Sequence, residues 1–195
     1  MPLKILVLNA SLMGLSDYFA NIVKDKVVKQ KEAEGYKTEV SYFDLNEELK
    51  GQLLTSATLA TFYDDIDKYL DVLKAHDIII CATSLINYHA SPAIVAFFNK
   101  IALSGVTFHY QDGYPVPLIK EFADKKVYVV ATAGTPKEMI TSGPATAFES
   151  VTQLFEYVGF KDIKLLYVAG TDAGDNFHKS FEYLAEKYNN ILSDI

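Results

Sequence analysis

The stretch DIIICATSLINYHASPAIVAFF, residues 77–98, decides the fold because it combines a buried strand, a polar loop and the start of a helix. The three isoleucines at 78–80 form a continuous β-branched run, which is typical of a central parallel strand covered on both faces. Ser91 and Pro92 are the residue types preferred at an N-cap and at the first helical position. The loop at residues 83–90 follows the carboxyl end of the strand, where open α/β sheets bind ligands. We therefore expect a binding site at this loop.

The alternation of apolar strands and amphipathic helices continues on both sides of this stretch. Apolar or alternating runs predict strands at residues 5–8, 37–43, 78–80, 127–131 and 163–169. Apolar residues at helical spacing predict helices at residues 16–34, 57–75, 92–104, 144–158 and 177–191. For the helix over 57–75, a break near Tyr63 is an alternative. This order requires a parallel sheet with helices on both faces. We predict an α/β fold, a flavodoxin-like three-layer sandwich with a five-stranded parallel sheet in the order 2-1-3-4-5.

Composition limits the classes of function. The chain has 195 residues, of which 50% are hydrophobic, and this suits one domain over residues 1–195. The net charge of -7 argues against nucleic acids and anionic membranes as partners. All 18 basic residues are Lys, so a phosphate would be held by amides, hydroxyls or Lys. The single cysteine, Cys81, lies in an apolar run, and the amino terminus lacks the pattern of a signal peptide or membrane span. We expect a cytoplasmic protein.

Three predicted loops follow the strands that flank the point where the strand order reverses. They cover residues 9–16, 83–91 and 132–143, and all three are rich in polar and small residues. Ser16 is expected to cap the helix after the first loop, where free amides and the helix dipole can bind an anion. The carboxylate of Asp17 would compete for the same amides. We expect these loops to form one ligand site.

Several short phrases of the sequence match those of a known family. Its loop after the third strand reads roughly M-Y-N-F-N-x-S, and a later phrase reads GVTF-x-Y. This chain has LINYHAS at 85–91 and GVTFHY at 105–110, together with LSDYF at 15–19 and GP at 143–144. Over nearly its whole length, the sequence resembles the FMN-dependent NADH:quinone and azo reductases of the flavodoxin-like superfamily.

The resemblance implies a role in FMN binding for each loop. Residues of the second loop would line the isoalloxazine ring: Leu85, Ile86, Asn87 and Tyr88. Residues of the third loop would surround its other edge: Thr132, Ala133, Gly134 and Thr135. Residues of the first loop would hold the phosphate: Ser11, Gly14 and Ser16. That loop is shorter than the family pattern, which implies a reduced phosphate site. Two alternatives stay open. In one, Asn87 satisfies only its own loop backbone and Tyr88 covers the third helix; in the other, Ser16 is only an N-cap and the first loop only a tight turn.

Two aromatic residues outside these loops are implied as substrate contacts. Tyr110 and the predicted excursion at 111–117 would close over the open face of the flavin. Tyr157 stands where the family has an aromatic residue that reaches the site of the neighbouring subunit in a homodimer, although a surface position without function is the alternative. His89 and His109 would either donate a proton to the acceptor or make plain polar contacts. The spacing of His and Cys residues predicts no metal site.

The implied function is two-electron transfer from NAD(P)H, with NADH as the expected donor, through FMN to quinones and azo compounds by a ping-pong mechanism. The chemistry takes place on FMN, so no side chain is predicted as a catalytic residue. One alternative is a flavodoxin-like binding module that has lost tight FMN binding through its short first loop. Another is an electron carrier without turnover of its own.

Overall fold

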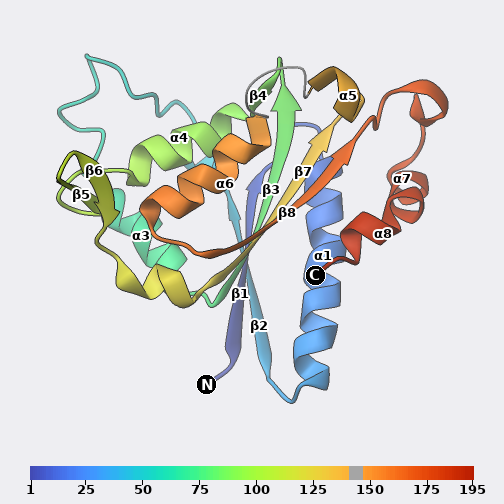
Figure 1. The fold of residues 1–195 in the computed structure, drawn as a ribbon, viewed down its shortest axis with the longest axis horizontal. Coiled ribbons are helices and arrows are strands. Elements are labelled where there is room, and N and C mark those ends of the chain that lie inside the picture. The colour runs from blue at the N-terminus through green and yellow to red at the C-terminus, as the bar shows by residue number, and fades with distance from the viewer. Residues whose placement is uncertain (141–146) are drawn as a thin grey trace.

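The computed structural model describes residues 1–140 and 147–195, and its centre is a twisted parallel sheet (Figure 1). The strands are β1 (Leu3–Ala10), β2 (Thr38–Asp44), β3 (Ile78–Ile86), β7 (Lys126–Ala133) and β8 (Asp162–Ala169). Their order is β2-β1-β3-β7-β8, and each neighbouring pair is parallel. The predicted flavodoxin-like sheet with the order 2-1-3-4-5 is confirmed.

Helices cover both faces of this sheet (Figure 1). One face packs against α1 (Leu15–Ala33), α7 (Phe181–Lys187) and α8 (Asn189–Leu192). The other packs against α3 (Ile66–Lys74), α4 (Pro92–Ile101) and α6 (Ala147–Val158). Two short helices, α2 (Leu45–Glu48) and α5 (Lys137–Ile140), follow β2 and β7. None of the helices in residues 1–140 and 147–195 is long and apolar enough to cross a membrane.

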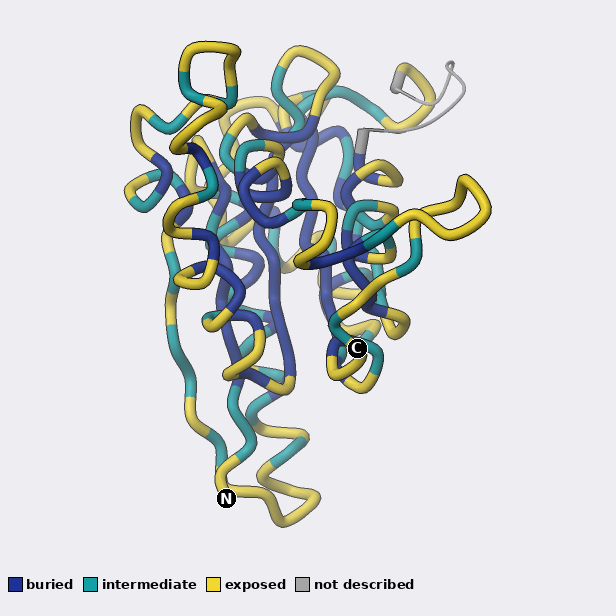
Figure 2. The backbone as a smooth tube through the Cα atoms, turned by 90° about the vertical axis from the view of Figure 1, so that its left-hand side faces the viewer, coloured by how far each residue is buried: buried dark blue, intermediate teal, exposed yellow. Residues whose placement is uncertain are grey.

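The strand β3 shows why the sheet is buried on both sides. Its first seven residues are all buried, and Figure 2 shows the strands enclosed by the helical layers. Ile79 and Cys81 enter the core beneath α4 and α6, whereas Ile78 and Ile80 enter the core beneath α1. Exposing either apolar face of such a strand to water costs free energy. The isoleucine run therefore occupies the centre of the sheet, where both faces are covered.

Shorter elements complete the fold. β4 (His89–Ala90) turns back antiparallel against the end of β3, so residues 83–86 of the predicted loop are part of a strand. A separate hairpin pairs β5 (Phe108–Gln111) with β6 (Tyr114–Pro117); β5 falls mostly on residues 106–110, whose alternation is typical of a strand, and β6 lies in the predicted excursion at 111–117. The 3-10 helices η1 (Lys120–Asp124) and η2 (Gly174–Asn176) connect later elements.

The predicted helix over residues 57–75 is wrong in its first half. Only residues 66–74 are helical, and residues 56–65 form a series of turns. The buried side chain of Lys100 on α4 explains the difference, because its ammonium group donates to the Phe62 carbonyl and pairs with Asp65. A buried charge must be solvated by protein groups, and these turns supply them.

The predicted helix over residues 177–191 is also divided. It consists of α7 and α8, which meet at Tyr188. The Tyr188 hydroxyl donates to the carbonyl of Ala169 (3.0 Å) and accepts from the side chain of Asn176 (2.9 Å). These hydrogen bonds anchor the junction to the end of β8. Phe177 lies outside both helices and is 59% exposed.

The predicted helix starts are correct only in part. α1 begins after Gly14 without a side-chain cap, and Ser16 lies inside the helix. Pro92 takes the first position of α4 as predicted, but the Ser91 side chain makes no cap hydrogen bond. The predicted helix start at Pro144 lies outside the described residues.

Candidate functional site

The carboxyl ends of the parallel strands lie at one edge of the sheet, at the top of Figure 1. β1 and β3 stay paired as far as Ala10 and Thr83, and β3 and β7 stay paired as far as Ser84 and Thr132. The segments that follow are the first loop (residues 11–14), the β3–β4 turn (residues 87–88) and the β7 loop (residues 134–136). The strand order reverses between β1 and β3, so this edge, here called the crevice, has the geometry of a ligand site.

The first loop satisfies much of its own hydrogen bonding. The Ser11 amide donates to Oδ1 of Asn9 (2.9 Å), and the Gly14 amide donates to Oγ of Ser11 (3.1 Å). The Asn46 side chain donates to the Ser11 carbonyl (3.1 Å) and to Oδ1 of Asp44 (3.0 Å). Gly14 enters α1 at a φ of 81°, a conformation that L side chains rarely adopt. The loop is a tight turn, and the amides of the first turn of α1 are the donors that adjoin it.

Ser16 is held inside the protein. Its hydroxyl is hydrogen-bonded to Oγ of Ser84 on β3 at 2.9 Å, and its side chain is fully buried. Thr132 on β7 is paired in register with Ser84 and is 5% exposed. An anion at this end of α1 would therefore meet the Ser16 amide, because the hydroxyl is already bound to β3.

The β3–β4 turn holds two non-glycine residues in the left-handed conformation. Asn87 has a φ of 49° and Tyr88 a φ of 64°. A two-residue hairpin turn of type I′ has positive φ at both positions, which Asn tolerates better than most residues. Leu85 and Ile86 are half-buried at the end of β3, whereas Tyr88 is 62% exposed. The turn thus presents an amide side chain and a phenol ring above an apolar wall.

The β7 loop is tied to the loop that follows β8. The amides of Gly170 and Asp172 donate to the carbonyls of Thr135 (2.9 Å) and Gly134 (3.2 Å). A Cβ atom at Gly134 would lie 2.7 Å from Oδ2 of Asp172, so the two loops are in close contact. Ala133, the last residue of β7, is buried. Within the described part of the chain the Thr135 amide donates no hydrogen bond, so it can meet an acceptor on a ligand.

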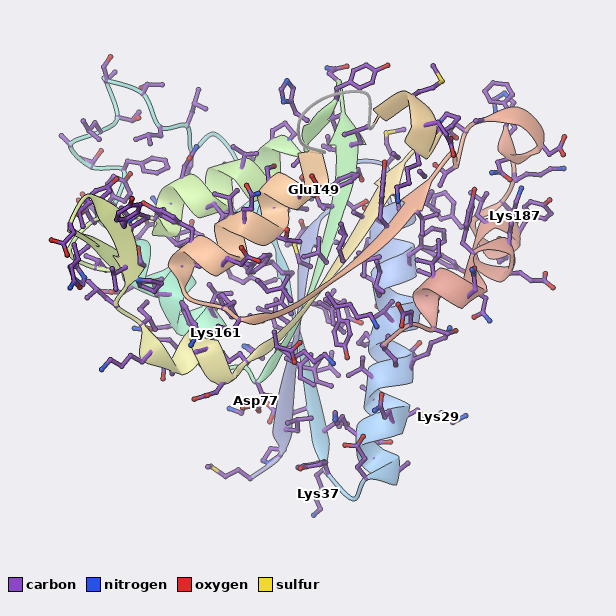
Figure 3. All side chains as sticks on the ribbon, in the orientation of Figure 1. Lys29, Lys37, Asp77, Glu149, Lys161 and Lys187 are labelled. Atoms are coloured by element: carbon purple, nitrogen blue, oxygen red, sulfur yellow. The ribbon has the colours of Figure 1, made fainter. Side chains whose placement is uncertain are left out.

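Tyr110 and Tyr157 lie together on the β5–β6 hairpin and α6. Both pack against Phe108, with ring centroids 5.5 and 4.7 Å from its own. Burial and a hydrogen bond with Tyr110 raise the pKa of the Tyr157 phenol. In Figure 3, Glu149 at the start of α6 lies near the upper edge of the sheet, and Lys161, just beyond its end, lies far below it. Within one chain the two tyrosines therefore lie at the far end of α6 from the β3–β4 turn.

His89 and His109 lie on different elements of the fold, β4 and β5. His89 is exposed beside the β3–β4 turn. His109 lies on β5, and its Nδ1 atom is buried without a hydrogen-bond partner in the part of the chain that the structure describes. Only His89 adjoins the crevice. No group of three or more His, Cys, Asp or Glu side chains that could hold a metal ion occurs among the described residues.

Two carboxylates at this edge were not predicted as site residues. Asp44 ends β2 and is linked to the first loop through Asn46. Asp172 follows β8 and lies against Gly134. Burial and the neighbouring Asp44 raise the pKa of the Asp17 carboxyl. The sequence could have indicated both Asp44 and Asp172 as site residues. Each lies at or just after the end of a predicted strand, and the carboxyl ends of parallel strands share one edge of the sheet.

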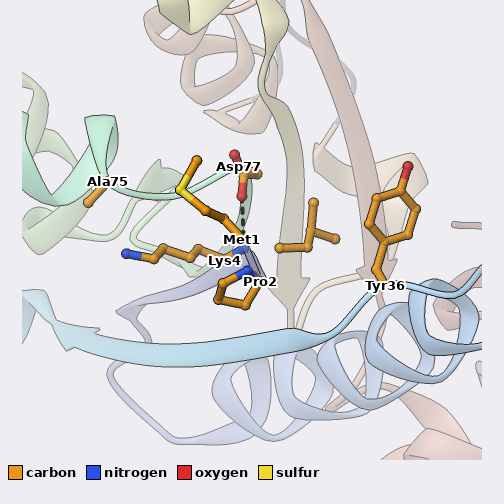
Figure 4. Close-up of a pocket in the computed structure, with 7 residues that line it drawn as sticks. Met1, Pro2, Lys4, Tyr36, Ala75 and Asp77 are labelled. Atoms are coloured by element: carbon orange, nitrogen blue, oxygen red, sulfur yellow. Dashed lines mark hydrogen bonds between the residues drawn. The ribbon is translucent and has the colours of Figure 1, made fainter.

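Cavities adjoin the crevice on the α4 side. One of about 230 Å³ lies between Leu12 of the first loop and Pro92 of α4. A neighbouring one of about 340 Å³ is lined in part by His89 and Val95. A hollow of about 470 Å³ lies at the opposite edge of the sheet, around the amino terminus and Asp77 (Figure 4). That edge holds the amino ends of the strands, which is not where such sheets bind ligands.

Comparison with known proteins identifies the family. The sequence profile of a family described as having a flavodoxin-like fold matches residues 3–192. The chain belongs to this family. Curated relatives of the chain are FMN-dependent NADH:quinone oxidoreductases, and they confirm the resemblance found in the sequence.

Relatives match most of this flavodoxin-like chain. The enzyme of that name from Mycoplasmopsis synoviae (strain 53) is 26% identical over 171 residues, which cover 86% of this chain and 85% of the relative. The enzyme from Escherichia coli O157:H7 is 28% identical over 186 residues, which cover 88% and 89%.

Solved structures agree with the fold. An azoreductase from Bacillus anthracis str. Sterne has a TM-score of 0.72 at 15% identity and covers 99% of this chain and 100% of its own. An FMN-dependent NADH-azoreductase from Bacillus anthracis str. Ames Ancestor, in complex with FMN, has a TM-score of 0.66 at 16% identity and covers 97% and 96%.

The donor groups of the crevice fit FMN, more closely at one end than at the other. We call the β3–β4 turn and the β7 loop the ring end, where Asn87 and the Thr135 amide can meet ring carbonyls and nitrogens above the Leu85 wall. We call the first loop and the first turn of α1 the phosphate end, where uncapped amides can bind an anion. The carboxylate of Asp17 in that turn opposes a phosphate.

Proposed function

We propose that this flavodoxin-like chain is an FMN-dependent NADH:quinone oxidoreductase that also reduces azo compounds. The observation that carries this proposal is the meeting of the first loop, the β3–β4 turn and the β7 loop at one sheet edge. Curated relatives of that name, which match most of the chain, support it. With FMN bound, the chemistry supplied is two-electron transfer from NADH to a quinone or azo acceptor in two successive half-reactions, a ping-pong mechanism.

The phosphate end binds and orients the anion. Ser11 keeps the first loop tight by accepting the Gly14 amide. Ser16 fixes the start of α1 against β3 through its hydrogen bond to Ser84. The first-turn amides are thereby held rigidly, and a rigid donor array loses little entropy when the phosphate binds.

The ring end orients the flavin and limits the access of water. Leu85 and Ile86 supply the apolar wall, and the exposed ring of Tyr88 covers one side. The side chain of Asn87 offers both a donor and an acceptor to the edge of the ring. On the other side, the backbone of residues 132–135 forms the opposing wall of the crevice.

A second copy of the chain completes the acceptor site in this proposal. Leu12, Leu53 and Val95 line cavities beside the crevice and are 51%, 66% and 39% exposed. Clustered exposed apolar residues indicate an interaction surface. Tyr157 lies near the carboxyl end of α6, and Tyr110 lies beside it on β5, at the end of α6 that is away from the β3–β4 turn. We therefore assign both tyrosines to the crevice of the other subunit of a homodimer.

We place the enzyme in the cytoplasm. Cys81 lies in the middle of β3, and burial raises the pKa of its thiol to about 12. A single inert thiol fits a reducing compartment.

The direct test measures flavin absorbance at about 450 nm. It then measures NADH oxidation with menadione as acceptor. The proposal predicts that purified protein retains or takes up FMN, and that NADH oxidation continues beyond one equivalent per bound flavin only when menadione is also present. Colourless protein that fails to take up added FMN would support a binding module. Protein that binds FMN but does not consume NADH would support an electron carrier.

A further inference from the structure

The phosphate end carries negative charge without a matching cation. Asp17 lies in the first turn of α1, and the Asn46 amide holds Asp44 beside the first loop. Neither carboxylate takes part in any of the ion pairs found among the described residues. Burial and the neighbouring Asp44 raise the pKa of the Asp17 carboxyl, which indicates that its ionised form is poorly compensated.

Few donors remain to balance a phosphate at this place. The Ser16 hydroxyl is bound to Ser84, and the Gly14 amide is bound to Ser11. The remaining favourable groups are backbone amides without an acceptor among the described residues: those of Leu12 and Met13 in the first loop, and those in the first turn of the 19-residue helix α1, which has no side-chain cap. The carboxylate of Asp17 stands in the same first turn, so its negative charge repels a phosphate bound to these amides.

We propose that Asp17 sets the flavin preference of this chain by offsetting most of the affinity that a phosphate group adds. FMN and riboflavin share the isoalloxazine ring and differ in the phosphate. The ring end supplies affinity that is common to both, and the phosphate end supplies the difference. The inference rests on the proposed function, because it takes the crevice to be a flavin site. It predicts that the protein as it stands binds FMN only a little more tightly than riboflavin, by less than about tenfold.

The experiment measures the dissociation constants of FMN and riboflavin by quenching of flavin fluorescence. It uses the unmodified protein, Asp17→Asn and the matched control Asp25→Asn. Asp25 lies on the same helix but is 73% exposed and pairs with Lys24. Asp17→Asn is expected to tighten FMN binding about fivefold and to leave riboflavin unchanged. Asp25→Asn is expected to change neither constant. Circular dichroism melting confirms that the variants are folded.

Each outcome decides the inference. A rise in the riboflavin-to-FMN ratio of dissociation constants for Asp17→Asn alone supports it. An unchanged ratio, or an equal shift for both flavins, overturns the inference and leaves the proposed function standing. If neither flavin binds to any of the three proteins, the inference and the proposed function fail together.

Discussion

The phosphate end and the ring end of the crevice use their backbone groups in opposite ways. In the first loop, the amides of Ser11 and Gly14 are bonded within the loop or to its flanking residue. In the β7 loop, carbonyls bond to the next loop, and the Thr135 amide donates no hydrogen bond to any residue in 1–140 or 147–195. The β3–β4 turn adds Asn87, which has a left-handed backbone conformation and lies at the same edge. One end is closed and acidic, and the other presents groups suited to a planar ligand.

This contrast teaches that affinity for a ring and affinity for a phosphate are built separately. A helix start binds an anion only when its amides lack other acceptors. A planar ring instead needs an apolar wall and a few polar groups at its edge. Substitutions at the ring end should therefore affect every flavin, while those at the phosphate end should affect stability or phosphate recognition.

The largest expected effect comes from filling the ring end. Gly134→Val places a branched side chain against Asp172 and should weaken the binding of both FMN and riboflavin by about tenfold or more. Fluorescence titration measures the loss. Gly134→Ala is the milder control, because the outer atoms of Asp172 can rotate away from a single methyl group. Equal affinity in all three proteins would remove the β7 loop from the site.

The next effect separates the Asn87 side chain from its backbone. Asn87→Ala should lower the affinity for both flavins about fivefold, because it removes the amide and also disfavours the left-handed conformation. Asn87→Gly retains that conformation without the amide group. If the amide matters, Asn87→Gly loses most of the flavin affinity that Asn87→Ala loses, as measured by absorbance titration. Recovery of affinity in Asn87→Gly would assign the role to backbone geometry alone.

At the phosphate end, the buried hydroxyl pair should be coupled. Ser16→Ala and Ser84→Ala each leave a buried hydroxyl without its partner and should each lower the free energy of unfolding by about 1–2 kcal/mol. The double substitution should cost less than the sum of the two, as urea denaturation can measure. Strict additivity would mean that the two hydroxyls do not interact in solution.

The smallest effect lies outside the crevice, in β3. Burial raises the pKa of Cys81 from 9.0 to about 12, so the folded state keeps its proton where the unfolded state loses it. The free energy of unfolding should therefore fall as the pH rises from about 8 to 10, by about 1 kcal/mol more than in Cys81→Ala. Urea denaturation at the two pH values compares the proteins. Equal losses in both would show that the thiol titrates normally when folded.

The strands were predictable because their apolar patterns are local. The isoleucine run at residues 78–80 and the half-exposed β2 follow directly from which faces are covered. The prediction of a helix over residues 57–75 was wrong in its first half, because the side chain of Lys100, far along the chain, is buried beneath that half. The prediction of one helix over residues 177–191 was wrong because the helix is divided at Tyr188, whose hydroxyl is hydrogen-bonded to the Ala169 carbonyl. Both errors arise from long-range hydrogen bonds that periodicity does not reveal.

The location of the candidate site could be predicted from the sequence, but the contacts of its individual residues could not. The rule for open α/β sheets located its three segments, and the resemblance assigned residues to them. The sequence did not indicate that the Ser16 hydroxyl binds Ser84, or that Asp44 lies beside the first loop. Residue type alone predicted an N-cap at Ser16, whereas the observed N-cap is the left-handed Gly14, two residues earlier. These details depend on how α1 is seated on β3.

The central claim is that the first loop, the β3–β4 turn and the β7 loop bind one FMN molecule. Titration of ¹⁵N-labelled protein with FMN, followed by the chemical shifts of its amides, tests this most directly. The account predicts shifts at Leu15, Asn87 and Thr135, and none at Lys4 or Asp77 beside the hollow in Figure 4. Shifts confined to Lys4 and Asp77, or no shifts at any concentration of FMN, would contradict it.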